Sequence, residues 1–261
     1  MKIITWNVNG IRAVATKGFK EFVKNENPDI LCIQETKAFE NQFLKDVGEI
    51  EGYKYIWHAG ETAGYAGTAI FYKESLEVLN GRNHFEDVEH FHTDGRITEI
   101  KTSNFVLLNG YFPNGGTRAD GTEMLTYKLE FYDKIIDYAN KLVASGENVI
   151  ITGDFNICHE EIDIARPKEN EDSIGFLPIE RAKISELLNN GYIDVWRKLN
   201  PEKKDVYSWW SYRAGARPRN VGWRLDYFIV NKNFINKIEN MEYLTSIMGS
   251  DHCPVKLKIK D

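Results

Sequence analysis

The sequence predicts an α/β protein in which helices are layered on β-sheets. Short apolar runs rich in β-branched and aromatic residues recur along the 261 residues, and segments with helical spacing lie between them. No low-complexity linker interrupts this alternation, which indicates that strands and helices belong to one architecture. The length fits one large domain, or two α/β halves that meet near residue 147 and pack as one. We therefore expect residues 1–261 to form a single domain.

Eight apolar runs are expected to form strands. They are Lys2–Trp6, Asp29–Ile33, Thr68–Tyr72, Ile97–Lys101, Phe105–Tyr111, Val149–Thr152, Tyr227–Val230 and Val255–Ile259. Apolar residues at spacings of three and four predict a helix over Leu125–Ala139, which Gly146 brings to an end. Shorter helices are expected around Ile184–Leu188 and over Phe19–Lys24.

Composition and charge exclude several classes of protein. Hydrophobic residues make up 42% and charged residues 28%, which is ordinary for a globular protein and unlike a disordered or fibrous chain. No run of 18 or more apolar residues occurs, so we expect no membrane-spanning helix. The formal net charge of -6 on its own disfavours a protein that coats nucleic acid nonspecifically.

The cysteines and the first residues predict a location. Cys32, Cys158 and Cys253 are too far apart, and odd in number, for a disulfide framework or a paired CxxC metal site, which favours a reducing compartment. The opening residues MKIITWN lack the long apolar stretch and the cleavage site of a signal peptide. We expect a cytoplasmic protein.

Polar side chains gather where the predicted strands begin or end, which is where α/β proteins tend to form their sites. The set consists of Asn7, Asn9, Glu35, Asn109, Tyr111, Asn114, Asp154, Asn156, Asp226, Asp251 and His252. Any one of them has a simple structural explanation, as a turn former, a helix cap or a structural histidine. Together they offer hard oxygen ligands, which suit Mg²⁺ and not structural zinc, and one group that titrates near neutral pH.

Signatures of other chemistries do not occur in the sequence. It has no GxxxxGK[ST] phosphate loop, no GxSxG elbow, no HExxH and no GxGxxG after the first strand. Metal-assisted hydrolysis of a phosphoester needs a cation on the phosphate, a positioned water and donors aimed at the developing charge. The residues at the strand ends can supply all three.

Several motifs occur in a fixed order between Trp6 and Pro254. They are PDILCIQETK around Glu35, then GYFPN, GDFN, DVWRK, YSWW, NVGWRLDYF and SDHCP. Together they resemble the exonuclease III type of apurinic/apyrimidinic (AP) endonuclease, within the endonuclease/exonuclease/phosphatase superfamily. The resemblance implies a DNase I-like, four-layer α/β sandwich, in which two mixed β-sheets pack face to face with helices on the outside.

The resemblance also implies a metal site. Glu35 would be the main Mg²⁺ ligand, and Mn²⁺ could substitute for Mg²⁺. The other residues close to the metal or its waters would be Asn7, Asp154, Asn156 and Asp251. Asn9 stands where many members of the family carry Asp, and the number of metal ions, one or two, is left open.

The implied catalytic groups are His252, Asp226, Asp154, Asn156 and Tyr111. His252 would contact the scissile phosphate, and Asp226 would accept its ring N–H. Asp154 would align and deprotonate the attacking water with Asn156 nearby, and Tyr111 would donate to a phosphate oxygen. A histidine beside a carboxylate is stabilised as imidazolium, and a carboxylate crowded by others accepts a proton more easily. Either Asp154 or His252 could take the proton of the water, and we favour Asp154.

A segment rich in arginine and tryptophan, Tyr207–Asp226, is expected to meet the substrate. From Ser211 to Arg224 it holds four arginines, at positions 213, 217, 219 and 224, and no acidic residue. Arginines beside aromatic rings suit a nucleic-acid backbone and an unstacked sugar, although we expect Trp210 to belong to the core. The expected contacts to DNA or its phosphates are Asn114, Arg118, Arg213, Arg217 and Asn220.

The resemblance implies an apolar pocket of Trp209, Trp223 and Leu225 that accepts a deoxyribose without its base. Extruding such a site from the duplex sacrifices little stacking. We therefore expect a Mg²⁺-dependent enzyme that cuts DNA 5′ to abasic sites and leaves a 3′-hydroxyl and a 5′-deoxyribose phosphate. Side activities as a 3′–5′ exonuclease and a 3′-phosphatase or 3′-phosphodiesterase are expected too. Its partner would be double-stranded DNA with abasic or blocked 3′ ends, bound by a monomer.

Two other functions compete with this one. The same fold could hydrolyse the phosphate of a lipid or inositol head group, but the Arg/Trp segment and the lack of a membrane-seeking apolar element count against it. A nucleic-acid-binding module without catalysis would require a gap in the catalytic set, and the sequence has none apart from Asn9.

Overall fold

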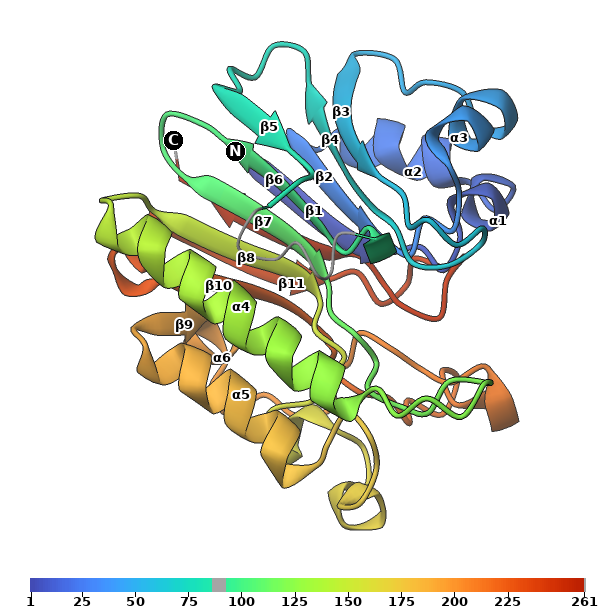
Figure 1. Cartoon of the computed structure of the whole chain (residues 1–261), viewed down its shortest axis with the longest axis vertical. Coiled ribbons are helices and arrows are strands. Elements are labelled where there is room, and N and C mark those ends of the chain that lie inside the picture. The colour runs from blue at the N-terminus through green and yellow to red at the C-terminus, as the bar shows by residue number, and fades with distance from the viewer. Residues whose placement is uncertain (86–92, 261) are drawn as a thin grey trace.

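The computed structural model describes residues 1–85 and 93–260, which fold into two β-sheets with helices on their outer faces (Figure 1). The first sheet has the strand order β11-β12-β1-β2-β4-β3 and the second β5-β6-β7-β8-β10-β9. The strands of the first sheet are β1 (Lys2–Asn7), β2 (Ile30–Gln34), β3 (Tyr53–His58), β4 (Thr68–Lys73), β11 (Ile238–Tyr243) and β12 (Val255–Ile259). Those of the second are β5 (Asn80–Arg82), β6 (Ile97–Lys101), β7 (Val106–Tyr111), β8 (Val149–Asp154), β9 (Tyr192–Asp194) and β10 (Asp226–Asn231).

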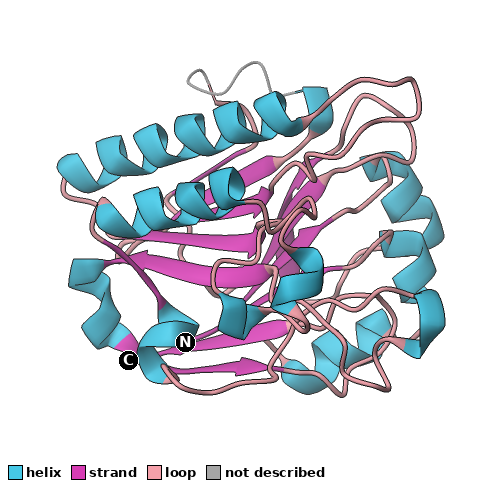
Figure 2. Ribbon diagram, turned by 90° about the horizontal axis from the view of Figure 1, so that it is seen from below, coloured by secondary structure: helices cyan, strands magenta, loops and turns pink. Residues whose placement is uncertain are grey.

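Both sheets are mixed, and helices enclose them on opposite sides (Figure 2). The pairs β1–β2 and β7–β8 are parallel, and the other pairs are antiparallel. The α-helices are α1 (Ile11–Ala15), α2 (Phe19–Glu26), α3 (Glu40–Asp46), α4 (Leu125–Ala144), α5 (Pro178–Asn189) and α6 (Val195–Leu199). Short 3-10 helices are η2 (Glu161–Asp163), η3 (Pro167–Asn170), η4 (Arg213–Gly215) and η5 (Lys232–Lys237). In the described residues, no helix is long and apolar enough to cross a membrane.

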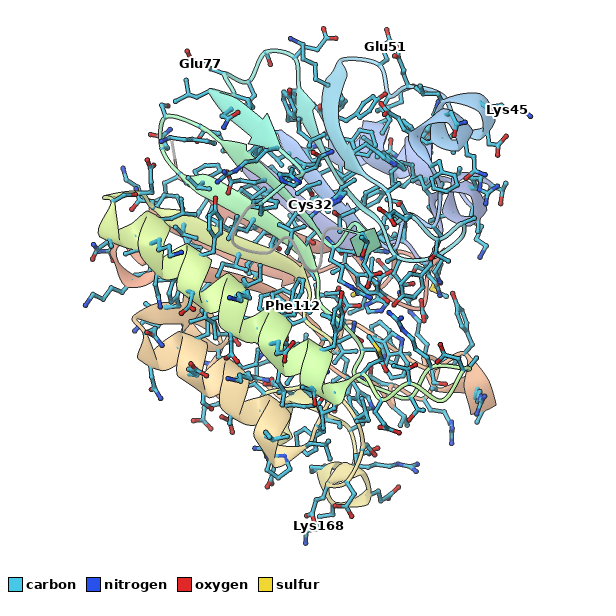
Figure 3. All side chains as sticks on the ribbon, viewed as in Figure 1. Cys32, Lys45, Glu51, Glu77, Phe112 and Lys168 are labelled. Carbon is cyan, nitrogen blue, oxygen red and sulfur yellow. The ribbon has the colours of Figure 1, made fainter. Side chains whose placement is uncertain are left out.

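Three apolar cores separate the four layers. The core between the sheets joins Ile3, Ile30, Cys32 and Ile70 of the first sheet to Ile100, Leu107, Ile150 and Phe228 of the second. A second core packs α4 and α5 on the second sheet, and a third packs α1, α2 and α3 on the first. Because the inner strands are covered on both faces, they are apolar along most of their length. Figure 3 shows Cys32 in the interior, whereas Lys45, Glu51 and Lys168 lie at the periphery. The predicted four-layer sandwich is thus confirmed.

All eight predicted strands are present. The strands and the helices that the sequence did not predict were missed for two different physical reasons. The missed strands β3, β5, β9 and β11 are the four sheet edges. An edge strand is covered less completely, so its apolar residues alternate with polar ones or are few. The missed helices α1, α3 and α6 have only five to seven residues, too few to show a helical period.

The two sheets do not correspond to the two halves of the chain. Residues 2–73 and 238–259 supply the strands of the first sheet, and residues 80–231 supply those of the second. Position 147 lies between α4 and β8, within the part of the chain that builds the second sheet. Each half therefore contributes strands to both sheets, which ties the halves together through the central core.

Candidate active site

In the first sheet, the strand register brings four predicted side chains to the same end of the strands. Asn7 ends β1, and Glu35 follows β2, which runs parallel to β1 with Gln34 opposite Asn7. Asp251 and His252 precede β12, which is antiparallel to β1. An antiparallel strand begins where its neighbour ends, so all four side chains gather at the same end of the sheet.

The second sheet places three further side chains together at one end of its inner strands. Tyr111 lies opposite Asp154 in the parallel pair of β7 and β8, and Asp226 lies opposite Asp154 in the antiparallel pair of β10 and β8. A hydrogen bond of 2.8 Å from Asn7 Nδ2 to Asp154 Oδ2 joins these strand ends to those of the first sheet. The two sheets therefore share one site, as the strand-end residues predicted.

His252 is held between two carboxylates inside the protein. Its Nδ1 lies 2.7 Å from Asp226 Oδ2, and its Nε2 lies 3.7 Å from Asp154 Oδ2. All three side chains are buried. Ser208 Oγ accepts the backbone N–H of Asp226 at 3.0 Å, and Ser250 Oγ accepts that of His252 at 3.2 Å. These bonds hold the backbone of both residues, and the carboxylate of Asp226 favours the ring form in which Nδ1 donates to it while Nε2 faces Asp154.

The charges and the burial of this group shift the pKa values of Asp154 and His252. Burial raises the pKa of Asp154, and the negative charge of Asp226 also raises it, against the opposing effect of His252. Burial alone would lower the pKa of His252, but Asp226 and Asp154 outweigh it and raise this pKa above its usual range. These shifts favour a charged His252 and make Asp154 the better proton acceptor of the two.

Glu35 is oriented by a tyrosine and a lysine. Its Oε1 accepts a hydrogen bond from the Tyr111 hydroxyl, and its Oε2 lies 3.0 Å from Lys37 Nζ. Burial and the charge of Glu35 raise the pKa of Tyr111 well above its usual range, so its hydroxyl remains a donor. The guanidinium of Arg96 lies 5.0 Å from the centre of the Tyr111 ring, a cation–π contact that supports the ring from behind.

Asn9 links Asp251 to Lys37. Its Nδ2 donates to Asp251 Oδ1 at 2.9 Å, and its Oδ1 accepts from Lys37 Nζ. Asp251 Oδ2 accepts from Trp209 Nε1 at 3.1 Å. Burial would raise the pKa of Asp251, but the charge of His252 and these two hydrogen bonds outweigh it and lower the pKa. Asp251 therefore stays ionised, which suits a neighbour of a cation.

The donors of the site suit a hard divalent cation. In the described part of the chain, Asp154, Asp226 and His252 form a buried group whose ligand atoms lie within 4.8 Å of one another and could bind a metal ion. The charged ring of His252 would repel a cation, and Asp226 already accepts its N–H. The carboxylates of Glu35, Asp154 and Asp251 line one pocket and offer oxygen atoms only.

Asn156 is held in an unusual backbone conformation beside Asp154. Its φ of 51° lies in the left-handed region, which is uncommon for a residue other than glycine. Its backbone N–H donates to Asp154 Oδ1 at 2.9 Å, and its Nδ2 donates to the carbonyl of Phe112 at 2.8 Å. Asn114 Nδ2 donates to Asn156 Oδ1 at 3.3 Å, and Asn114 itself is exposed at the pocket. The structure thus brings both predicted asparagines to the acidic group.

The acidic residues share a pocket of about 490 Å³ with an apolar wall. Trp209, Trp223 and Leu225 form this wall, and the two indole rings meet edge to face with centres 6.0 Å apart. Ser173, Ile174 and Gly175 complete the lining on the side of Trp223. The pocket is therefore lined by both charged and apolar side chains, and the three residues that the sequence assigned to an apolar pocket are among them.

The predicted DNA-contacting arginines and Asn220 lie in different surroundings. Arg118 and Arg213 are exposed, and Arg118 lies 5.6 Å from the centre of the Tyr65 ring. Arg217 is half-buried and donates to the carbonyls of Thr245, Ile247 and Ser250, with its guanidinium 4.6 Å from the Trp210 ring. Asn220 bonds to Trp210 Nε1 and to the carbonyl of Asp205.

Two of the expected DNA contacts are therefore engaged within the protein. Arg217 and Asn220 hold the Arg/Trp segment in place, and neither of them lines the pocket. Trp210 is 2% exposed and belongs to the core, as predicted. Arg224, counted in the sequence as part of a basic segment, is fully buried against Asp163 and Asp194.

Several residues at the site were not predicted. Lys37 contacts Glu35 and Asn9, and Ser173–Gly175 lines the pocket. Lys37 stands within the PDILCIQETK motif, so its place two residues after Glu35 was a usable signal. The Ser173–Gly175 segment carries no chemical signature, and only the folded chain brings it near Trp223.

Comparisons with known proteins agree with this site. A sequence model of the Endonuclease/Exonuclease/phosphatase family matches residues 4–252. The chain is 40% identical to an exodeoxyribonuclease of Bacillus subtilis over 99% of both chains. It is also 40% identical to a DNA-(apurinic or apyrimidinic site) endonuclease of Dictyostelium discoideum, over 98% of this chain and 69% of that protein. A crystal structure of an AP endonuclease from Leishmania major superposes with a TM-score of 0.88 at 30% identity, covering 100% of this chain and 87% of the other.

Proposed function

The chain belongs to the endonuclease/exonuclease/phosphatase family, and from this premise we propose that it is a DNA-repair phosphodiesterase that cuts the backbone 5′ to abasic sites. The single observation that carries the proposal is the mixed lining of one pocket, in which three carboxylates and His252 lie beside the indole rings of Trp209 and Trp223. The charged groups suit a phosphodiester, and the apolar groups suit a sugar without its base. Hydrolysis leaves a 3′-hydroxyl and a 5′-deoxyribose phosphate.

Mg²⁺ is the proposed cofactor, and Mn²⁺ is expected to replace it. Glu35 and Asp251, with Asp154 nearby, would hold the ion, which would neutralise charge on the scissile phosphate. The hydrogen-bonded amides of Asn7 and Asn156 orient Asp154 and support the site. The pKa of the Tyr111 hydroxyl is raised, so the hydroxyl keeps its proton. It donates a hydrogen bond to Glu35 in the structure and would donate to a phosphate oxygen that takes the place of Glu35.

The residues of the chain divide the hydrolytic step between them. Asp154 takes a proton from the attacking water, whose oxygen forms a bond to phosphorus while the bond from phosphorus to the 3′ oxygen breaks. The leaving 3′ oxygen takes a proton from a solvent water molecule to become the hydroxyl, and Asp154 then returns its proton to the solvent. His252, kept charged by Asp226, donates to a phosphate oxygen and stabilises the charge that grows there. Asn114, Arg118 and Arg213 are proposed to contact the flanking phosphates.

The names of the relatives support further proposals for this chain. We expect 3′–5′ exonuclease and 3′-phosphatase or 3′-phosphodiesterase activity, because the relative from Bacillus subtilis is an exodeoxyribonuclease. A duplex with abasic or blocked 3′ ends is the proposed partner. We also propose that residues 1–261 act as a single domain and a monomer, in the cytoplasm, where bacterial DNA lies.

Cleavage of a duplex that carries one tetrahydrofuran abasic analogue tests the proposal. With Mg²⁺ we expect incision directly 5′ to the analogue and a 3′-hydroxyl end. EDTA should abolish the incision, and Mn²⁺ should restore it. The matched control is the same duplex with a normal nucleotide in place of the analogue. Cleavage that is equally fast in both duplexes, or that persists in EDTA, would overturn the proposed function.

A further inference from the structure

Lys128 is a fully buried lysine that belongs to none of the groups described above. It lies in the first turn of α4, and its side chain and that of Glu180 on α5 are both 0% exposed. Lysine is almost never fully buried unless its charge is paired and its donors are satisfied. Here the Nζ atom donates to Glu180 Oε1 at 2.6 Å and to the carbonyls of Asn156 and Asn114 at 2.7 Å and 2.9 Å. All three of its N–H bonds are used.

The acceptors belong to three segments that surround the site. Asn114 and Asn156 line the pocket with their side chains, while their carbonyls point back to Lys128. Glu180 Oε2 accepts from the backbone N–H groups of Gly175 and Leu177, at 2.6 Å and 3.1 Å. Gly175 is part of the pocket lining. One buried ion pair thus connects three loops that are far apart in the sequence and meet at the proposed reaction centre.

The bond to Asn156 supports a strained conformation. The left-handed backbone of Asn156 costs about 1 kcal/mol or more and persists only where its surroundings hold it. That backbone directs the N–H and the amide of Asn156 toward Asp154. The fit is close on the other side as well, since a Cβ at Gly115 would lie 2.8 Å from Lys128 Cδ. Lys128 therefore bonds directly to the peptide whose geometry aims Asn156.

Stability alone does not explain a buried ion pair at this place. Well-packed apolar residues of similar volume often replace a buried ion pair with no loss of stability. A methionine at position 128 would fill nearly the same space, but it has no N–H to hold the two carbonyls. Only the lysine can hold the Asn114 and Asn156 segments and, through its bond to Glu180, connect them to α5.

We propose that Lys128, together with Glu180, is a positioning residue that sets the Asn114 and Asn156 segments around the reacting phosphate. This inference rests on the proposed function of the site. Lys128 touches no reacting atom, and it acts through the backbone of the two asparagines. Its loss is expected to slow the chemical step much more than it weakens DNA binding, because Arg118 and Arg213 of the proposed DNA contacts do not depend on Lys128.

The test compares the full-length parent with the double variant Lys128→Met/Glu180→Gln. We expect the single-turnover rate constant for incision at the abasic analogue to fall about 100-fold. The dissociation constant for the same duplex, measured by fluorescence anisotropy in EDTA, should change less than about threefold. The matched control is Lys183→Met, which removes an ion pair to Asp133 between the same two helices but touches no loop of the site. It should cut at the parent rate.

Each outcome of the test separates this inference from the proposed function. A parent that does not cut refutes the function, whereas a parent and a double variant that cut equally fast refute the positioning role. An equal loss of rate and of DNA affinity would also refute it. If the double variant does not fold, Glu180→Gln alone decides. The amide N–H group of the glutamine would face either the Lys128 ammonium or the Gly175 N–H, so one of these donors would lose its acceptor. A roughly tenfold slower single-turnover rate would support the inference, and an unchanged rate would overturn it.

Discussion

Replacing Asp226 with asparagine tests the carboxylate behind His252. The two atoms that carry the opposite charges, Nδ1 and Oδ2, lie 2.7 Å apart inside the protein. At an effective dielectric constant of about 20, such charges attract each other by about 6 kcal/mol. Asparagine has nearly the same shape but no charge, so burial then acts on His252 with only Asp154 and Asp251 opposing it, and the pKa of His252 falls. The amide can also donate to Nδ1 and select the wrong tautomer.

We expect the single-turnover rate constant of Asp226→Asn at pH 7 to fall about 10³- to 10⁴-fold, which corresponds to about 4–5.5 kcal/mol of transition-state stabilisation. The sign of the pH effect follows from the raised pKa of His252. In the parent the ring stays charged through neutral pH, whereas in the variant the charged form is lost as the pH rises. The residual rate of the variant should therefore decline from pH 6 to pH 8 relative to the parent.

The assay is rapid-quench incision of the abasic duplex, with DNA affinity measured separately. The control variant Asp133→Asn removes an exposed carboxylate that pairs with Lys183 on the outer helices, and it should leave the rate unchanged. The reasoning fails if Asp226→Asn retains a rate within tenfold of the parent with the same pH profile. That result would mean that the charge of His252 does not contribute to the reaction.

Three further predictions follow from the structure. Trp223→Ala should lower kcat/KM on an abasic duplex about 10- to 100-fold while activity on a plain 3′-phosphodiester changes less, and equal losses would contradict the pocket assignment. Although Asp163 is buried, Arg224 and Arg197 lower its pKa to about 2, so the stability it provides is present above about pH 4 and is lost as the pH falls toward 2. Urea unfolding should show a loss of about 1.8 kcal/mol between pH 4 and pH 2 that Asp163→Asn does not show. In the third prediction, Arg213→Gln should reduce the salt dependence of DNA binding by about one phosphate contact, whereas Arg217→Gln should lower the melting temperature and leave the salt slope unchanged.

The grouping of the candidate site residues could be predicted from the sequence because strand ends are visible there. Tyr111 and Asp154 each end a long apolar run, and Asp226 begins one. Once these runs form adjacent strands of one sheet, the register requires their polar ends to meet. The edge strands could not be predicted in the same way. β11 alternates buried with exposed residues, and β5 has three residues, none of them fully buried.

The roles of individual arginines could not be predicted from the sequence. Arg213, Arg217 and Arg224 belong to one segment without acidic residues, and nothing nearby in the chain distinguishes them. Their partners lie elsewhere: carbonyls at 245–250 accept from Arg217, and Asp163 and Asp194 pair with Arg224. Lys128 illustrates the same limit, because its acceptors lie 14, 28 and 52 residues away.

The placement of these arginines changes the physical meaning of the net charge of -6. Two of the four arginines in the Arg/Trp segment bind within the protein, so fewer positive charges face the DNA than the sequence suggests. The pocket itself is lined by the carboxylates of Glu35, Asp154 and Asp251, which repel a phosphate until a cation lies between them. Undamaged DNA would then gain little from long-range attraction. On the proposed function, discrimination would follow from this weakness, because a duplex would bind well only where a base-free sugar enters the pocket beside Trp209 and Trp223 while its phosphate reaches the cation.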